Sequence, residues 1–149
     1  METLNIETDK MFTDITDWVS NQVPKNFNGL ATVSTPHTTA GLAQLENELL
    51  HLVDIRFFLD SLVPKLKPFE GAQLNAKYLH DMISLREGIP ADERVNGHSH
   101  IRSLFFPDTT SALIVDGILR LGDWKRIFFV ELDPIRPREV FLMLTAESS

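Results

Sequence analysis

The sequence predicts a single α+β domain in which antiparallel β-sheet dominates and a few helices pack beside it. Four strand-like segments, residues 109–115, 118–121, 126–132 and 139–144, follow one another across short turns. Strands joined so closely pair antiparallel rather than through helical crossovers. The chain has 149 residues and is 43% hydrophobic, which suits one ordinary domain with one core. We therefore expect one compact domain over residues 1–149.

Alternation and helical spacing predict four elements in the first half of the chain. Residues 3–8 alternate polar and apolar side chains, as in a half-buried strand, and residues 30–34 form a second, mostly apolar strand. Residues 15–23 and 48–63 carry apolar side chains at helical spacing, and a proline that cannot continue the helix follows each of them.

The middle of the chain is less regular. Residues 65–92 have weak periodicity, so we expect a long loop with a short helix, which is unusual in a compact domain unless it is functional. Residues 98–106 fit another short helix. Asp116-Gly117 predicts a hairpin of type I′ character, and Gly122-Asp123 predicts another turn.

Composition excludes several classes of function. The net charge of −7 disfavours nucleic-acid and anionic-membrane binding, and the absence of cysteine excludes disulfides and thiolate chemistry. No basic and apolar leader is visible, and no apolar run approaches the ~18 residues that span a bilayer. We expect a cytoplasmic protein without a nucleic-acid or membrane partner. Nucleotide-binding glycine motifs and the usual hydrolase and metalloprotease motifs are also missing.

The histidines are the candidates for chemistry, because an imidazole binds metals and transfers protons near neutral pH. His37 follows a predicted strand in a threonine-rich turn, although that turn can equally be a local capping structure. His98 and His100 would share one side of a strand. On a helix they diverge, which leaves His100 facing a site and His98 at its edge; the alternative is a polar helix start with one surface histidine. His51 lies inside a predicted helix, and we interpret it as structural.

Charged residues near apolar runs are a second group of candidates. Glu131 interrupts a very hydrophobic strand, so it either faces solvent or is buried against an arginine or a metal ion. Arg136 and Arg138 flank Pro137. Two arginines on such a turn can bind phosphate through their guanidinium groups, and a solvated turn is the alternative.

In this order, several short blocks resemble the YjbQ-like family, often called secondary thiamine-phosphate synthases. The blocks are Asp14-Ile15-Thr16, His37-Thr38-Thr39-Ala40-Gly41-Leu42 followed by Glu46-Asn47, Tyr78-x-His80-Asp81, Asn96-x-x-x-His100-Ile101-Arg102, Asp116-Gly117, Gly122-x-Trp124 with Ile127, Glu131, and Arg136 with Arg138. The match covers nearly the whole chain.

The resemblance implies an antiparallel α+β fold, a homotrimer, and a pocket that acts on a phosphorylated small molecule. It implies catalytic roles for His37, Glu46, His80, His100 and Glu131. Binding roles fall to Asn96, Thr109, Arg136 and Arg138. The family reaction would couple a pyrimidine pyrophosphate to a thiazole phosphate. A non-catalytic trimeric metal- or ligand-binding protein with degraded activity is the alternative.

The same resemblance allows a divalent metal. His37, His80, His100 and His98 would suit Zn, Mn, Ni or Fe, and Mg would suit the phosphate chemistry. One departure concerns the phosphate. The family has a Gly-Ser/Thr turn after the His100 block, where this chain has Pro107-Asp108-Thr109. Proline removes an amide donor, which weakens any phosphate binding by that turn.

Overall fold

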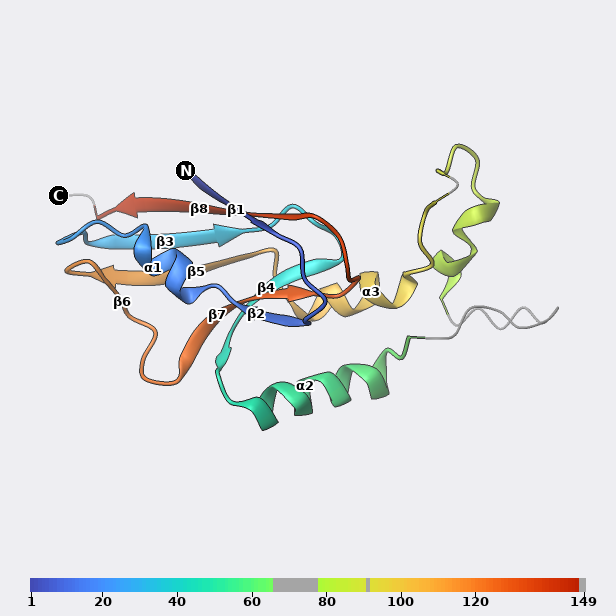
Figure 1. Cartoon of the computed structure of the whole chain (residues 1–149), viewed down its shortest axis with the longest axis horizontal. Coiled ribbons are helices and arrows are strands. Elements are labelled where there is room, and N and C mark those ends of the chain that lie inside the picture. Colours follow the sequence, from blue (N-terminus) through green and yellow to red (C-terminus); the bar gives the residue numbers. More distant parts are fainter. Residues whose placement is uncertain (66–77, 91, 148–149) are drawn as a thin grey trace.

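The computed structural model describes residues 1–65, 78–90 and 92–147 and folds them into two antiparallel sheets with a helix against one of them (Figure 1). The five-stranded sheet has the order β1 (Glu2–Ile6), β8 (Arg138–Ala146), β3 (Gly29–Ser34), β5 (Thr109–Val115), β6 (Ile118–Leu119). The three-stranded sheet has the order β2 (Phe12–Asp14), β7 (Lys125–Glu131), β4 (Ala40–Glu46). The α+β class with antiparallel sheets is confirmed.

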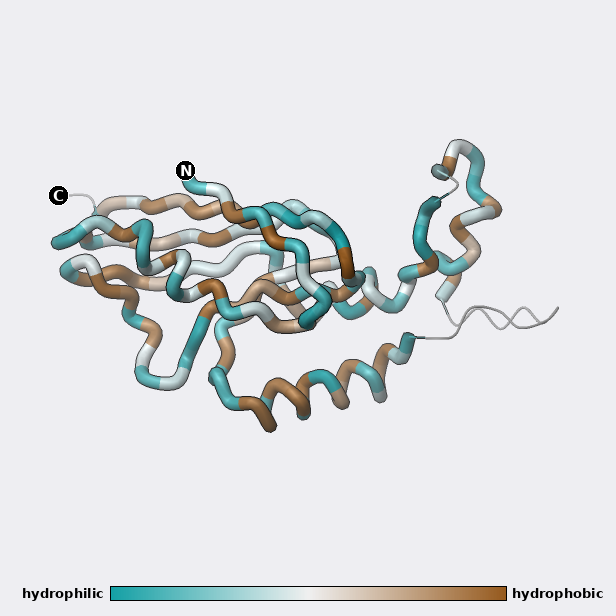
Figure 2. Tube along the Cα trace, in the orientation of Figure 1, coloured by the Kyte–Doolittle hydropathy of each residue, from teal (hydrophilic) through white to brown (hydrophobic). Residues whose placement is uncertain are grey.

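The main core lies between the two sheets. Strand β3 turns Ala31 and Val33 inward, and both are fully buried against residues of the other sheet such as Leu42 and Phe129. Apolar residues recur along the strands in Figure 2, as the alternation in the sequence predicts. This core fixes the ends of β3 and β4, between which His37 is placed.

Helix α2 (Leu49–Leu62) covers the other face of the three-stranded sheet, which confirms the predicted helix over 48–63. Leu59 is 1% exposed and packs with Phe128 and Val130. The carboxylate of Glu48 accepts hydrogen bonds from two amides of the first turn, so the helix begins with a capped end.

Short helices form the rest of the described chain: α1 (Thr16–Asn21), the 3₁₀ helix η1 (Leu79–Leu85), α3 (Gly97–Arg102) and the 3₁₀ helix η2 (Ser103–Phe105). α3 and η2 together correspond to the predicted helix over 98–106. η1 is a short helix within the predicted loop over 65–92, of which residues 66–77 and 91 lie outside the described residues.

Two strands were not predicted, and one predicted turn has the expected geometry. Residues Ala40–Ala43 of β4 are all buried, because the core covers one face and α2 the other, so no alternation marks this strand. Strand β2 has three residues and exists through its pairing with β7. In the hairpin, Asp116 and Gly117 both have positive φ, 53° and 79°, as a type I′ turn requires. Within the described ranges, no helix is long and apolar enough to cross a membrane.

Candidate functional site

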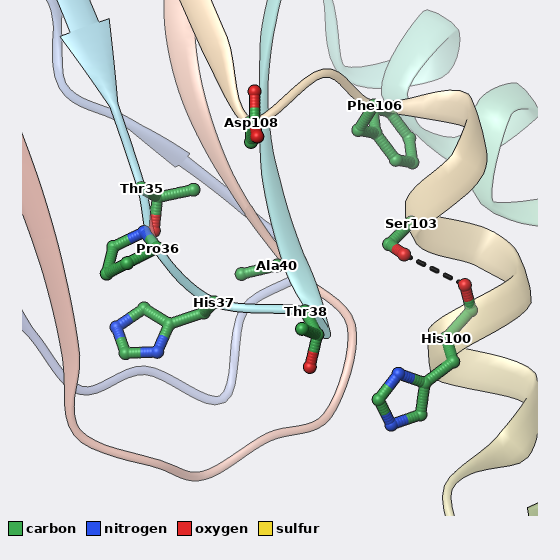
Figure 3. A pocket seen from close by; sticks show the side chains of 9 residues that line it. All are labelled: Thr35, Pro36, His37, Thr38, Ala40, His100, Ser103, Phe106 and Asp108. Carbon is green, nitrogen blue, oxygen red and sulfur yellow. Dashed lines mark hydrogen bonds between the residues drawn. The ribbon is translucent and has the colours of Figure 1, made fainter.

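Two adjoining cavities lie where the β3–β4 loop faces α3. One has a volume of about 390 Å³ and the other about 410 Å³, and they share Pro36, His37, Thr38 and His100. Figure 3 shows the first, with His37 and His100 on facing sides and Thr38 between them. The second also contains His80, Asn96, Arg136 and Arg138 from segments far apart in the sequence. The structure thus brings three of the five histidines to one place.

His37 is held on a rigid loop. The Thr35 amide donates to the Asp108 carbonyl at 2.8 Å, and the Thr35 hydroxyl donates to the Glu139 carbonyl at 3.0 Å. The Glu139 amide in turn donates to Nε2 of His37 at 2.9 Å. Because Nε2 is an acceptor here, the ring proton of the neutral imidazole is on Nδ1. Burial, and then the nearby Arg138, lower the pKa of His37, so the neutral form is favoured.

His80 and His100 form a ring pair on the opposite side. Their ring centroids lie 4.5 Å apart with an interplanar angle of 35°. His80 comes from η1 and His100 from α3, where the hydroxyl of Ser103 donates to the His100 carbonyl at 2.8 Å (Figure 3). Burial, and then the neighbouring His80, lower the pKa of His100. Nδ1 of His80 is buried without a hydrogen-bond partner among the described residues.

Arg138 and Glu131 form a buried ion pair behind the cavity. The guanidinium donates to both carboxylate oxygens, at 2.7 and 2.6 Å, and to the Thr39 hydroxyl at 3.1 Å. Of the two alternatives for Glu131, burial against an arginine is therefore the one found. These bonds use Nε and Nη2 of Arg138, so the arginine holds Thr39 and the end of β7.

Arg136 and Arg86 are the more available cations of the larger cavity. Nε of Arg136 lies 3.0 Å from an Asp133 carboxylate oxygen, while its Nη2 is 3.7 Å from Glu93, so its outer edge is only loosely paired. Arg86 is exposed and forms no ion pair among the described residues. An anion that enters this cavity would meet these two guanidinium groups.

Several predicted site residues lie elsewhere. Glu46 is exposed at the end of β4, opposite Lys125, and does not line either cavity. Thr109 begins β5, where its hydroxyl donates to Ser34 at 3.1 Å. His98 is buried beside Ser99, with its Nε2 3.2 Å from the hydroxyl, and it lines neither cavity. The structure does not bring these three to His37 and His100.

Sequence reasoning missed Asp133, although it organises the site. Its amide donates to Glu131 at 2.8 Å, and its carboxylate accepts from Asn96 at 2.9 Å and contacts Arg136. Asp108, Ser103 and Arg86 were missed as well. The signal for Asp133 was a second acid, two residues after Glu131, before a turn that carries two arginines.

A metal ion on His37, His80 and His100 would need three donors within reach of one point. Among the residues that the structure describes, no group of three His, Asp or Glu side chains could hold a metal ion. Nε2 of His37 also already accepts a backbone hydrogen bond. The described residues therefore do not fit a metal ion, and metal binding stays a prediction that elemental analysis of tag-free protein can check.

The class of protein is therefore an antiparallel α+β protein whose two sheets support a cavity of histidines and arginines. Comparisons with known proteins show the family. A family model described as "UPF0047 protein YjbQ-like" matches residues 2–147, so the chain belongs to the YjbQ-like UPF0047 family. The family predicted from the sequence blocks is thereby confirmed.

Curated relatives and solved structures agree with this assignment. A UPF0047 protein of Archaeoglobus fulgidus is 33% identical over 129 residues, which cover 87% of this chain and 86% of the relative. One of Methanocaldococcus jannaschii is 31% identical, over 90% and 84% of the two chains. The crystal structure of a hypothetical protein of Aeropyrum pernix has a TM-score of 0.76 and 31% identity, over 99% of this chain and 100% of the other. A YjbQ/UPF0047 protein of Clostridium acetobutylicum has a TM-score of 0.74 and 27% identity, over 97% and 100%.

Proposed function

We propose that this protein is an enzyme that acts on a phosphorylated small molecule in the cavity between His37 and His100. One observation carries the proposal: a cavity of about 410 Å³ collects His37, His80 and His100 together with Arg86 and Arg136. Imidazoles that transfer protons and guanidinium groups that bind phosphate are the two components that phosphoryl and pyrophosphoryl substrates need.

His100 is the proposed general base. Burial and His80 lower its pKa, so its ring is neutral near pH 7 and a lone pair is free to take a proton. His37 has the complementary role, because its Nε2 is occupied by the Glu139 amide and its Nδ1–H is left as a hydrogen-bond donor. A neutral imidazole held in this way can stabilise negative charge that develops on an oxygen of the substrate.

The reaction to test first is the coupling of a pyrimidine pyrophosphate to a thiazole phosphate. In this reaction His100 takes a proton from the amino group of the pyrimidine, the bond between the methylene carbon and the pyrophosphate oxygen breaks, and pyrophosphate leaves with the electron pair. The thiazole nitrogen then forms a bond to the methylene carbon, and His100 returns the proton to the amino group. Charge develops on the departing pyrophosphate, where Arg86 and Arg136 would stabilise it.

The assay follows thiamine-phosphate formation by the wild type, His100→Ala and the control His51→Ala. His51 lies on α2 and lines neither cavity. Loss of a general base lowers the rate by about 10²–10⁴-fold, so we expect that loss for His100→Ala and none for His51→Ala. Equal rates for both variants would reject the role of His100, and an inactive wild type would reject this reaction.

The second candidate is a ligand-binding protein with degraded activity, and Asp108 is the observation that favours it. Its carboxylate lines the smaller cavity with His37 and His100, where it would repel a phosphate. Phosphate would then bind only in the larger cavity, beside Arg86 and Arg136. Binding of inorganic phosphate that Arg86→Ala weakens, without turnover of any phosphorylated substrate offered, is the result that this alternative predicts.

We also propose a homotrimer. Support comes from the five-stranded sheet, which leaves Leu113, Met143 and Ile118 60%, 54% and 57% exposed. Exposed apolar groups of this kind mark protein interfaces. Light scattering should give three times the 16.9 kDa chain mass for the wild type, and a lower mass for Leu113→Glu. A monomeric wild type would contradict the proposal.

A further inference from the structure

The two adjoining cavities share four residues but differ in the charges that line them. Arg86 and Arg136 line the larger cavity, of about 410 Å³, where Glu93 is the only carboxylate among the described residues. The smaller cavity, of about 390 Å³, has Asp108 and neither lysine nor arginine among the described residues that line it. A ligand that fills both cavities therefore meets positive charge at one end and negative charge at the other.

Asp108 is held in place through its backbone, while its carboxylate is available to a ligand. Its carbonyl accepts from the Thr35 amide at 2.8 Å, and the carbonyl of the preceding Pro107 accepts from the Leu42 amide at 2.8 Å. The carboxylate forms no hydrogen bond or ion pair with the residues that the structure describes. Because Asp108 is exposed, a ligand can reach this carboxylate without opening the protein.

Ser103 adds a second acceptor to the smaller cavity. It is half-buried, and its hydroxyl donates its proton to the His100 carbonyl at 2.8 Å (Figure 3). The oxygen of that hydroxyl is left with lone pairs that can accept a hydrogen bond. An ammonium group carries three N–H donors and no acceptor, so it matches a carboxylate and a hydroxyl oxygen in this state. An ionised phosphate offers acceptors only and does not match them.

We infer that the substrate of this protein is a phosphorylated amine, whose phosphate binds beside Arg86 and Arg136 and whose ammonium group binds beside Asp108. This inference rests on the proposed function and adds the class of substrate to it. His37 and His100 line both cavities, so they lie beside the part of the ligand that joins the two charges. An alkyl amine keeps its proton near neutral pH, as the lysine side chain does.

The test is calorimetric titration of the full-length protein, at low ionic strength and neutral pH, with two series of probes. One series is aminoalkyl phosphates with chains of two, four and six carbons, and the other is hydroxyalkyl phosphates of the same lengths. Chains long enough to join the two cavities should bind about two- to fivefold more tightly when they end in the amine, which is the contribution of an exposed ion pair. Asp108→Asn should remove this preference.

Two control variants accompany this measurement. Asp123→Asn removes the same charge from an exposed residue that lines neither cavity, so it should keep the preference for the amine. Arg86→Ala should weaken the binding of both series and leave their ratio unchanged, because it acts on the phosphate end alone.

The outcomes separate this inference from the proposed function. The inference is overturned, and the anion site left standing, if the wild type binds both series equally at every length or prefers the hydroxyalkyl phosphates. A preference that survives Asp108→Asn, or that Asp123→Asn removes as well, also overturns it. Binding of neither series overturns the proposed function, and the inference with it.

Discussion

Removing the Arg138 side chain charge should destabilise the protein severely. Glu131 and Arg138 have side chains 0% and 4% exposed and share two hydrogen bonds of 2.7 and 2.6 Å. In Arg138→Met the carboxylate of Glu131 stays buried, and the Asp133 amide at 2.8 Å is its remaining hydrogen-bond donor among the described residues. Breaking a buried pair from one side costs about 3–5 kcal/mol, because an uncompensated charge is left in the interior.

That loss is a large part of the stability of a domain, which is about 5–15 kcal/mol in total. The midpoint of urea unfolding should therefore be clearly lower for Arg138→Met than for the wild type. The double variant Glu131→Gln with Arg138→Met removes both charges and keeps an acceptor for the Asp133 amide. We expect it to recover part of the loss, so that the cycle gives a favourable coupling energy.

An exposed ion pair supplies the control. Arg56 and Asp60 on α2 lie 3.8 Å apart with side chains 68% and 48% exposed, and Arg56→Met should cost less than about 1 kcal/mol. The reasoning is refuted if Arg138→Met loses no more stability than Arg56→Met. It is also refuted if the double variant loses as much stability as Arg138→Met and Glu131→Gln lose separately, added together.

Two further predictions follow from burial and packing. Burial lowers the pKa values of His37, His98 and His100 below the ordinary 6.5, so the unfolded chain binds more protons. Stability should therefore be fully present above pH 6.5 and fall as the pH drops below it. Unfolding measured above and below pH 6.5 should show a smaller loss of stability for His98→Gln than for the wild type. Gly97→Ala would place a Cβ 2.7 Å from the Asp81 carboxylate, and overpacking of this kind costs about 1–3 kcal/mol. A thermal-unfolding midpoint equal to that of the wild type would contradict this packing argument.

The parts of the fold that could be predicted are those with a local pattern. Strand β5 was predicted at its observed bounds, because Thr109 to Val115 is a run rich in residues that favour strands. Strand β4 gave no such pattern, since its small and apolar residues are covered on both faces. Whether α2 would lie against this strand could not be known from the strand's own residues.

The site could be predicted as a set of residue types but not as a set of contacts. His37, His80 and His100 line one cavity, as the family resemblance implied. Glu46 belongs to the same sequence block as His37, yet β4 runs away from the loop and leaves it at the far end. Arg138 was predicted to bind phosphate, and its burial against Glu131 arises from the packing of β8 against the turn after β7.

The central claim is that phosphate-bearing ligands bind between His37 and His100, and histidine-selective NMR tests it most directly. The protein has five histidines, of which His37, His80 and His100 line the cavity while His51 and His98 do not. Titration with inorganic phosphate should move the ring signals of those three with one common dissociation constant and leave His51 in place. No movement of the three, or movement of His51 by the same amount, would contradict the claim.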